Sequence, residues 1–208
     1  MKEDLIDHLK IRLGLPLPGE EAQRLMTPEK LRDERFRNPS MRSAKLSGVL
    51  VLLYKKEGAW HIPLTLRNEY KGTHSGQISF PGGKKEESDE NLMATALREA
   101  HEEVGVEPSD VQVLGQLTNL YIPPSNFNVL PTLGYLSEKP TFYLDSFEVK
   151  ELIEVPVSLL KDNGTIKTTP MSFVNGYMVD MPYFDVYGHV VWGATAMMLS
   201  EWLAVIEN

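Results

Sequence analysis

Apolar residues change their spacing along the chain, and these changes predict where helices and strands lie. Between Leu5 and Leu13 they recur at helical spacing, until a Leu-Pro-Leu-Pro-Gly run at residues 15–19 interrupts the pattern. A second helix is expected to start with Thr27 as its N-cap and Pro28 at its first helical position, where a missing N–H costs least. The first forty residues therefore read as a detachable helical extension that serves packing or dimerisation.

From Ala44 onward, short β-rich runs alternate with a few helical segments. We expect strands at residues 46–54, 60–67, 111–117, 129–136, 148–155 and 177–186. Helices are expected at residues 88–104, directly after Pro156, and at 193–206. Turn signals stand at residues 57–58, 162–164 and 175–176. This order predicts an α/β domain at residues 41–208, a sandwich with a mixed sheet, preceded by the helical extension at residues 1–40.

The composition narrows the classes of function that the chain can have. With 42% hydrophobic and 24% charged residues among 208, it has the composition of a globular protein. The net charge of −8 disfavours a nucleic-acid partner, because proteins that bind nucleic acid neutralise phosphates with Lys and Arg. A small phosphate ligand stays open, since a local metal ion can reverse the sign of one site.

The sequence contains no cysteine, which excludes disulfides, thiol catalysis and zinc–thiolate sites and suggests a reducing compartment. The charged N-terminus is unlike a signal peptide, and no run approaches the ~18 apolar residues of a membrane helix. We therefore expect a soluble, cytoplasmic protein that does not associate with membranes.

The predicted helix at residues 88–104 carries a cluster of acids, with Ser88 as its expected N-cap. Glu99, Glu102 and Glu103 follow i, i+3, i+4 spacing and share one face of this helix. Like charges on adjacent turns repel, and a divalent cation such as Mg²⁺ or Mn²⁺ would turn that repulsion into affinity. The alternative interpretation is a solvated acidic face without a ligand.

Residues 83–106 resemble the Nudix box, whose usual form is Gly, five residues, Glu, seven residues, and then Arg-Glu-U-x-Glu-Glu-x-Gly-U with U apolar. Gly83 opens the box, and the run that starts at Arg98 matches its second half at every defined position. One residue too many separates Gly83 from the acid eight positions before Arg98, which is Glu90. Either the loop carries an extra residue, or Asp89 takes the place of that acid.

The residues upstream of the box resemble the leader motif of the coenzyme A diphosphatase branch of the same family. Leu-Thr-Leu-Arg at residues 64–67 is similar to Leu-Thr-x-Arg, and residues 74–83 are similar to His-x-Gly-Gln ahead of Phe-Pro-Gly-Gly. Asn68 stands where a small Ser or Ala is usual in that branch, and Lys71-Gly72 stands where Leu-Arg is usual. The resemblance covers approximately residues 40–208.

This resemblance implies a fold and an activity. The fold is the Nudix-type α/β/α sandwich with a mixed sheet, and the activity is metal-dependent hydrolysis of the diphosphate of coenzyme A or its thioesters. The products are phosphopantetheine species and adenosine 3′,5′-bisphosphate. ADP-ribose, NADH or damaged nucleotides stay open as substrates, and so does a non-catalytic Nudix-like binding module. Mg²⁺ or Mn²⁺ is the implied cofactor, a nucleotide-type small molecule the implied partner, and a homodimer stays open.

The resemblance also implies roles for individual residues. Glu99, Glu102 and Glu103 would hold the metal and, together with Arg98, carry the catalysis. Arg98 would orient a carboxylate through a bidentate bond, with Glu90 as the candidate. The substrate would be bound by leader residues and by the glycines at the start of the box, namely Arg67, His74, Gln77, Gly82 and Gly83. Further local cations for the 3′-phosphate of coenzyme A are Lys71, Lys84 and Lys85.

Overall fold

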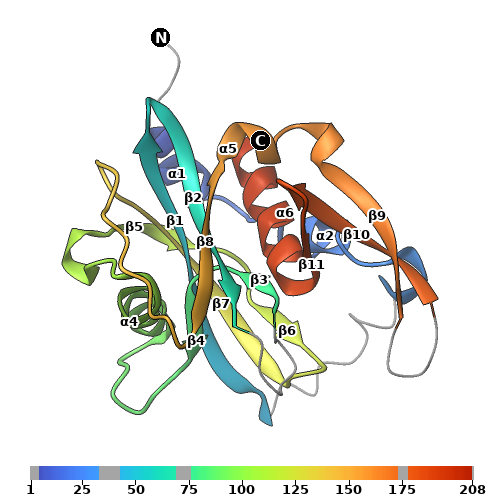
Figure 1. Ribbon diagram of the computed structural model, residues 1–208, viewed down its shortest axis with the longest axis horizontal. Coiled ribbons are helices and arrows are strands. Elements are labelled where there is room, and N and C mark those ends of the chain that lie inside the picture. Colours follow the sequence, from blue (N-terminus) through green and yellow to red (C-terminus); the bar gives the residue numbers. More distant parts are fainter. Residues whose placement is uncertain (1–4, 33–42, 69–75, 173–177, 208) are drawn as a thin grey trace.

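The computed structural model describes residues 5–32, 43–68, 76–172 and 178–207, and its strands fall into two sheets (Figure 1). The larger, mixed sheet contains β1 (Lys45–Lys56), β2 (Ala59–Arg67), β3 (Ile78–Ser79), β4 (Gly82–Lys84), β5 (Gln112–Gln116), β6 (Leu120–Ile122), β7 (Phe127–Tyr135) and β8 (Val149–Pro156). The smaller, antiparallel sheet contains β9 (Ile166–Ser172), β10 (Met178–Val186) and β11 (His189–Trp192).

Helices lie on both faces of the mixed sheet (Figure 1). The α-helices are α1 (Leu5–Arg12), α2 (Gly19–Arg24), α4 (Leu92–Val104), α5 (Val157–Leu160) and α6 (Gly193–Glu207). Short 3₁₀ turns are η1 (Glu29–Leu31), η3 (Pro108–Asp110) and η4 (Asn163–Thr165). Helix α4 covers one face, while α6 with α1 and α2 covers the other. The predicted α/β/α sandwich with a mixed sheet is thereby confirmed.

Strand β1 forms the centre of the domain, because its alternate side chains supply two different cores. Val49, Val51 and Leu53 belong to the core under α6, whereas Leu50 and its even-numbered neighbours pack against α4. This period-2 alternation places apolar groups on both faces of one strand, as expected for a strand covered on both sides.

The pairing of β1 makes the sheet mixed. It runs parallel to β7 and antiparallel to β4, with Ser47 opposite Lys84 in the second ladder. It also forms a hairpin with β2, through a turn in which Glu57 and Gly58 both have positive φ, at 52° and 79°. This hairpin confirms the turn that residues 57–58 predict.

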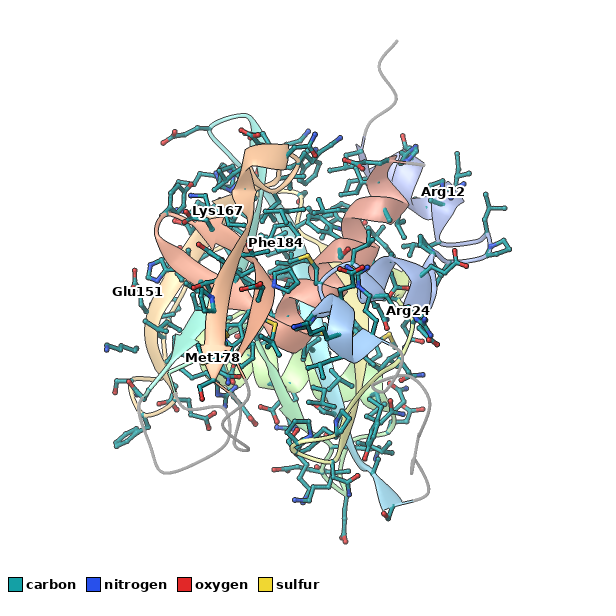
Figure 2. The ribbon with its side chains drawn as sticks, turned by 90° about the vertical axis from the view of Figure 1, so that its right-hand side faces the viewer. Arg12, Arg24, Glu151, Lys167, Met178 and Phe184 are labelled. Atoms are coloured by element: carbon teal, nitrogen blue, oxygen red, sulfur yellow. The ribbon has the colours of Figure 1, made fainter. Side chains whose placement is uncertain are left out.

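The N-terminal segment, expected to serve packing or dimerisation, packs into the main core. Ile6, Leu9 and Met26 are core residues, and the N-terminal helices lie against α6 (Figure 2). The side-chain amide of Gln23 donates a hydrogen bond of 2.8 Å to Glu201, a residue of α6 with no exposed surface. Residues 33–40 lie outside the described residues, so the domain boundary after residue 40 stays a prediction.

Several element boundaries differ from their predictions. Helix α2 was not expected. After Thr27 the chain forms the 3₁₀ turn η1, which begins one residue beyond Pro28, and Arg32 at the edge of the described segment is α-helical. The predicted turn at residues 175–176 lies outside the described residues. The strands and helices expected from residue 44 onward are present within a few residues of their predicted ends, with β3, β4, β6, β9 and β11 in addition.

Among the helices of the described segments, none combines the length and the apolarity that crossing a lipid bilayer requires.

Candidate active site

Helix α4 carries the acidic cluster and starts later than its sequence predicts. Its N-cap is Asn91, whose Oδ1 accepts a hydrogen bond of 2.9 Å from the backbone N–H of Ala94, so the expectation of Ser88 as N-cap is wrong. The physical reason is Asp89, whose side chain turns toward the helix and keeps the preceding residues in a loop. The helix ends at Gly105, which adopts the left-handed conformation with φ at 74°.

Glycines let the helix, β1 and β4 approach one another closely. A Cβ atom at Gly48 of β1 would overlap the carbonyl oxygen of Leu92 and would stand 2.9 Å from the backbone nitrogen of Ala96. A Cβ atom at Gly83 of β4 would overlap the carboxylate of Glu99. Gly82 has φ at 155° and a backbone N–H directed at Glu103. The two box glycines therefore form a backbone cradle for two of the three glutamates.

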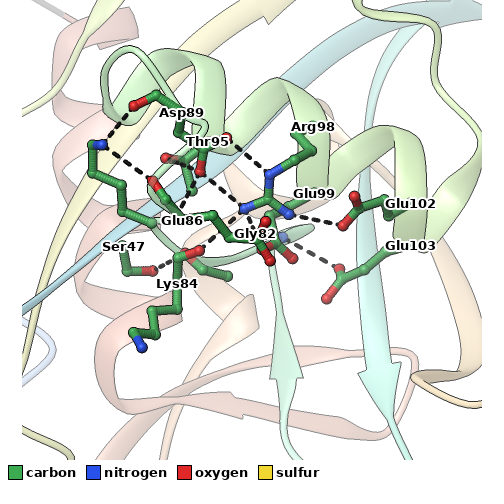
Figure 3. A network of polar contacts seen from close by, with 12 residues as sticks. Ser47, Gly82, Lys84, Glu86, Asp89, Thr95, Arg98, Glu99, Glu102 and Glu103 are labelled. Atoms are coloured by element: carbon green, nitrogen blue, oxygen red, sulfur yellow. Dashed lines mark hydrogen bonds and ion pairs between the residues drawn. The ribbon is translucent and has the colours of Figure 1, made fainter.

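Arg98 is held by Asp89 in a bidentate ion pair (Figure 3). Its Nε and Nη2 atoms donate to the two carboxylate oxygens over 2.9 and 3.0 Å. The hydroxyl of Thr95 and the backbone N–H of Glu86 donate to the same carboxylate, each over 2.9 Å. The Arg98 guanidinium holds the pKa of the Asp89 carboxyl well below its usual range. Of the two acids left open by the sequence, Asp89 is the one that pairs with Arg98, and Glu90 is exposed.

Replacing Asp89 with asparagine is expected to lower the free energy of unfolding by about 2 kcal/mol, because a charge-assisted bidentate bond to a nearly buried carboxylate is lost. For a domain of this size, that corresponds to a fall of about 4–8 °C in Tm, measurable by circular dichroism. Glu90→Gln is the matched control and should change stability by less than about 0.5 kcal/mol. Equal effects of the two variants would contradict the assignment.

The difference in free energy of unfolding between wild type and Asp89→Asn depends on pH, because the pKa of Asp89 is low. A carboxyl whose pKa is depressed in the folded state stabilises the fold at pH values above the unfolded pKa, about 3.9. That contribution is lost as the pH falls through the folded-state pKa. The gap between wild type and Asp89→Asn is therefore expected to be complete at pH 7 and to shrink below about pH 4.

The three box glutamates lie next to one another but differ in exposure (Figure 3). Glu102 is exposed and pairs with Nη1 of Arg98 over 2.8 Å, while Glu99 is half-buried and pairs with Nη2 over 2.9 Å. Glu103 is only 2% exposed, and its carboxylate accepts hydrogen bonds of 3.2 Å from the N–H of Gly82 and from Arg67.

Burial of these carboxylates changes their proton affinity. Desolvation raises the pKa of Glu103 to about 7, although Arg67 and the Gly82 N–H oppose the shift. Desolvation also raises the pKa of Glu99, against the opposing charge of Arg98. Burial of a carboxylate disfavours its charged form, and acids that are buried in spite of this are typical of functional sites.

Arg67 lies at the same site, but its guanidinium contacts acids of the protein. It reaches Glu103 over 3.2 Å and Glu148 over 3.5 Å, and its backbone N–H donates to the carbonyl of Gln77. Glu148 belongs to the run Glu-Val-Lys-Glu at residues 148–151, which resembles the same branch, but the sequence alone had suggested no role for this acid in the site. His74 and Lys71, two further candidates from the leader motif, lie outside the described residues.

The chemistry of the glutamates fits a hard divalent cation, since Mg²⁺ and Mn²⁺ prefer carboxylate oxygens. The lack of a Cβ atom at Gly83 is what allows the carboxylate of Glu99 to lie against the backbone of β4. In the described part of the chain, no three His, Asp or Glu side chains converge closely enough to hold a cation as they stand. The reason is that Arg98 holds Glu99 and Glu102 while Arg67 holds Glu103, so loading requires a change of side-chain rotamers.

The chain is similar in sequence to a known protein family. The model of the NUDIX domain matches residues 44–163. The chain is 34% identical over 143 residues to a protein of Pectobacterium atrosepticum named "Uncharacterized Nudix hydrolase NudL", covering 66% of this chain and 71% of that protein. It is 32% identical over 171 residues to "Nudix hydrolase 15, mitochondrial" of Arabidopsis thaliana, covering 78% of this chain and 59% of that protein.

Solved structures show the same fold. A MutT/nudix family protein from Enterococcus faecalis superimposes with a TM-score of 0.53 over 85% of this chain and 67% of that protein, at 16% identity. The match of the family model spans β1 to α5 and includes the acidic helix with its glycine cradle. The chain therefore belongs to the NUDIX domain family, as a Nudix diphosphate hydrolase.

Proposed function

We propose that this protein hydrolyses the diphosphate of coenzyme A or its thioesters, with Mg²⁺ or Mn²⁺ as cofactor. The observation that carries the hydrolase chemistry is the buried carboxylate of Glu103, held beside Glu99 and Glu102 against the backbone of Gly82 and Gly83. A purely solvated acidic face would leave this side chain in water, whereas only 2% of Glu103 is exposed. The leader motif supports coenzyme A as the substrate class.

The reaction needs in-line attack of water on one phosphorus of the diphosphate and release of the bridging oxygen to the other phosphate. Glu99, Glu102 and Glu103 would hold the metal ion, which, when bound, neutralises phosphate charge and lowers the pKa of a bound water. The N–H of Gly82 fixes one oxygen of Glu103, while Arg98 pairs with Glu99 and Glu102 and would release them to the cation. Asp89 in turn fixes Arg98, so the orientation of the cluster rests on a buried acid.

A panel of candidate substrates tests the proposed function. Purified protein is incubated with Mg²⁺ or Mn²⁺ and coenzyme A, acetyl-coenzyme A, ADP-ribose or NADH, and the products are identified by mass. Coenzyme A is expected to give phosphopantetheine and adenosine 3′,5′-bisphosphate, with the highest kcat/KM of the panel. Equal kcat/KM for ADP-ribose would overturn the coenzyme A assignment. Tight binding without hydrolysis of any compound would favour a non-catalytic module instead.

A further inference from the structure

The loop before β8, residues 145–148, lies beside the candidate site and presents an aromatic side chain to solvent. Phe147 is 90% exposed, the largest exposed fraction among the large apolar side chains in the described segments. Its sequence neighbour Glu148 shares Arg67 with Glu103, so the backbone of Phe147 is close to the acidic cluster. A single exposed apolar side chain is common on protein surfaces, but this one stands on a loop that contacts the acidic cluster, where it is available to a bound substrate.

The loop is held in one conformation by its own hydrogen bonds. The carboxylate of Asp145 accepts a bond of 2.7 Å from the N–H of Phe147, and its carbonyl accepts bonds from Glu148 and Val149. Its N–H donates over 3.0 Å to the carbonyl of Glu103. The loop is thus attached to the last turn of α4, at the residue that carries the buried carboxylate.

Asn68 ties the same loop to the end of β2. Its side-chain amide donates to the carbonyl oxygens of Ser146 and Phe147, over 2.8 and 2.9 Å, and its N–H donates to the carbonyl of Glu148. Both amide hydrogens are used, and neither a serine nor an alanine at this position could supply two such bonds. Asn68 is therefore a departure from the leader motif that has a structural consequence in this chain.

We propose that Phe147 is a substrate-binding residue on which the base of the nucleoside diphosphate derivative stacks, and that Asn68 is the positioning residue that holds it. The inference rests on the proposed function, since it requires the diphosphate to bind at the carboxylates beside this loop. A ring fixed in advance binds at a low entropic cost, because the loop does not need to be ordered by the substrate. Stacking on an aromatic side chain tolerates any base, since every base has a π-face.

The test compares Phe147→Ala and Phe147→Trp with Tyr187→Ala, a matched control for an exposed aromatic residue in the turn between β10 and β11. Phe147→Ala is expected to raise KM by about tenfold with little change in kcat, the size expected for the loss of one stacked base. Phe147→Trp should restore KM, and Tyr187→Ala should leave it unchanged. A KM for Phe147→Ala within about twofold of wild type would overturn the proposal.

A binding measurement separates this inference from the proposed function. ADP, which has a base, and inorganic diphosphate, which has none, are titrated calorimetrically into wild type and Phe147→Ala with Mg²⁺ present. The variant is expected to lose affinity for ADP by about tenfold and to keep its affinity for diphosphate. Equal losses for both ligands, or no binding of ADP to wild type, would overturn the inference. Base-dependent binding without hydrolysis of any substrate would overturn only the proposed function.

The role of Asn68 is tested through a double-mutant cycle. Asn68→Ala is expected to raise KM several-fold with kcat unchanged, and Asn68→Asp, which cannot donate the two bonds, should behave similarly. If Asn68 acts through Phe147, the double variant is no worse than Phe147→Ala alone. Independent effects of the two substitutions on KM would show that Asn68 does not act through the Phe147 ring. A fall in kcat would show instead that Asn68 acts through its neighbour Arg67, which contacts Glu103.

Discussion

Replacing Glu103 with glutamine is expected to lower kcat by about two to three orders of magnitude, the range seen when one preorganised charge-stabilising group is removed. Glutamine keeps the size of the side chain and an oxygen that can accept the Gly82 N–H, so the shape of the cradle is preserved. The charge that would bind a cation is lost. The measurement is steady-state hydrolysis of the best substrate in the panel, together with Mn²⁺ affinity by electron paramagnetic resonance.

The control for this experiment is Glu107→Gln, because Glu107 is an exposed acid just beyond the end of α4. It should hydrolyse substrate and bind Mn²⁺ as wild type does. Glu103→Gln should also unfold within a few degrees of wild type, since replacing a desolvated carboxylate by an amide removes a buried charge. Wild-type turnover in a folded Glu103→Gln protein would remove this residue from the mechanism.

Replacing Gly48 with alanine is expected to lower the free energy of unfolding by about 3 kcal/mol, the upper end of the usual cost of overpacking. The added Cβ atom would collide with the carbonyl oxygen of Leu92, and backbone cannot move away as a flexible side chain can. Helix α4 would have to shift on β1. For a domain of this size, the corresponding fall in Tm is about 6–12 °C.

Gly14→Ala is the matched control, because a Cβ atom there would meet the Ile11 carbonyl oxygen at an ordinary distance of 3.4 Å. Thermal unfolding of both variants is followed by circular dichroism. Similar unfolding midpoints for the two would show that α4 does not rest on Gly48 as closely as described. Because α4 carries Glu99 and Glu103, Gly48→Ala should also reduce turnover more than its loss of stability alone explains.

Local patterns in the sequence predicted much of the fold. The apolar run at residues 46–54, the turn at residues 57–58 and the end of the acidic helix at residue 104 are short-range features, and each is present. Helix α2 was not predictable in the same way. It has six residues between a Pro-Gly pair and a 3₁₀ turn, and its stability comes from packing on α6, which is distant in sequence.

The site was predictable only as far as its spacing along one helix. The motif predicted which glutamates lie together, but it left open whether Glu90 or Asp89 is the first acid of the box, and the partner of Arg98 is Asp89. The choice depends on a loop conformation that Thr95 and Glu86 help to fix. The contact of Arg67 with Glu103 and Glu148 joins three segments far apart in sequence. No local pattern encodes such a contact, and the leader motif alone had suggested a substrate role for Arg67.

The hydrogen bonds at Glu201 have a consequence for how the chain behaves as a cooperative folding unit. This carboxylate accepts bonds from Gln23 and from the N–H of Thr118, so α6 bridges the chain's beginning and its middle. Excising only the stretch recognised by the family profile would strip away both the helix and its anchor. The apolar face of the sheet that α6 covers would then be exposed to water. Such a truncated protein is expected to self-associate through this face.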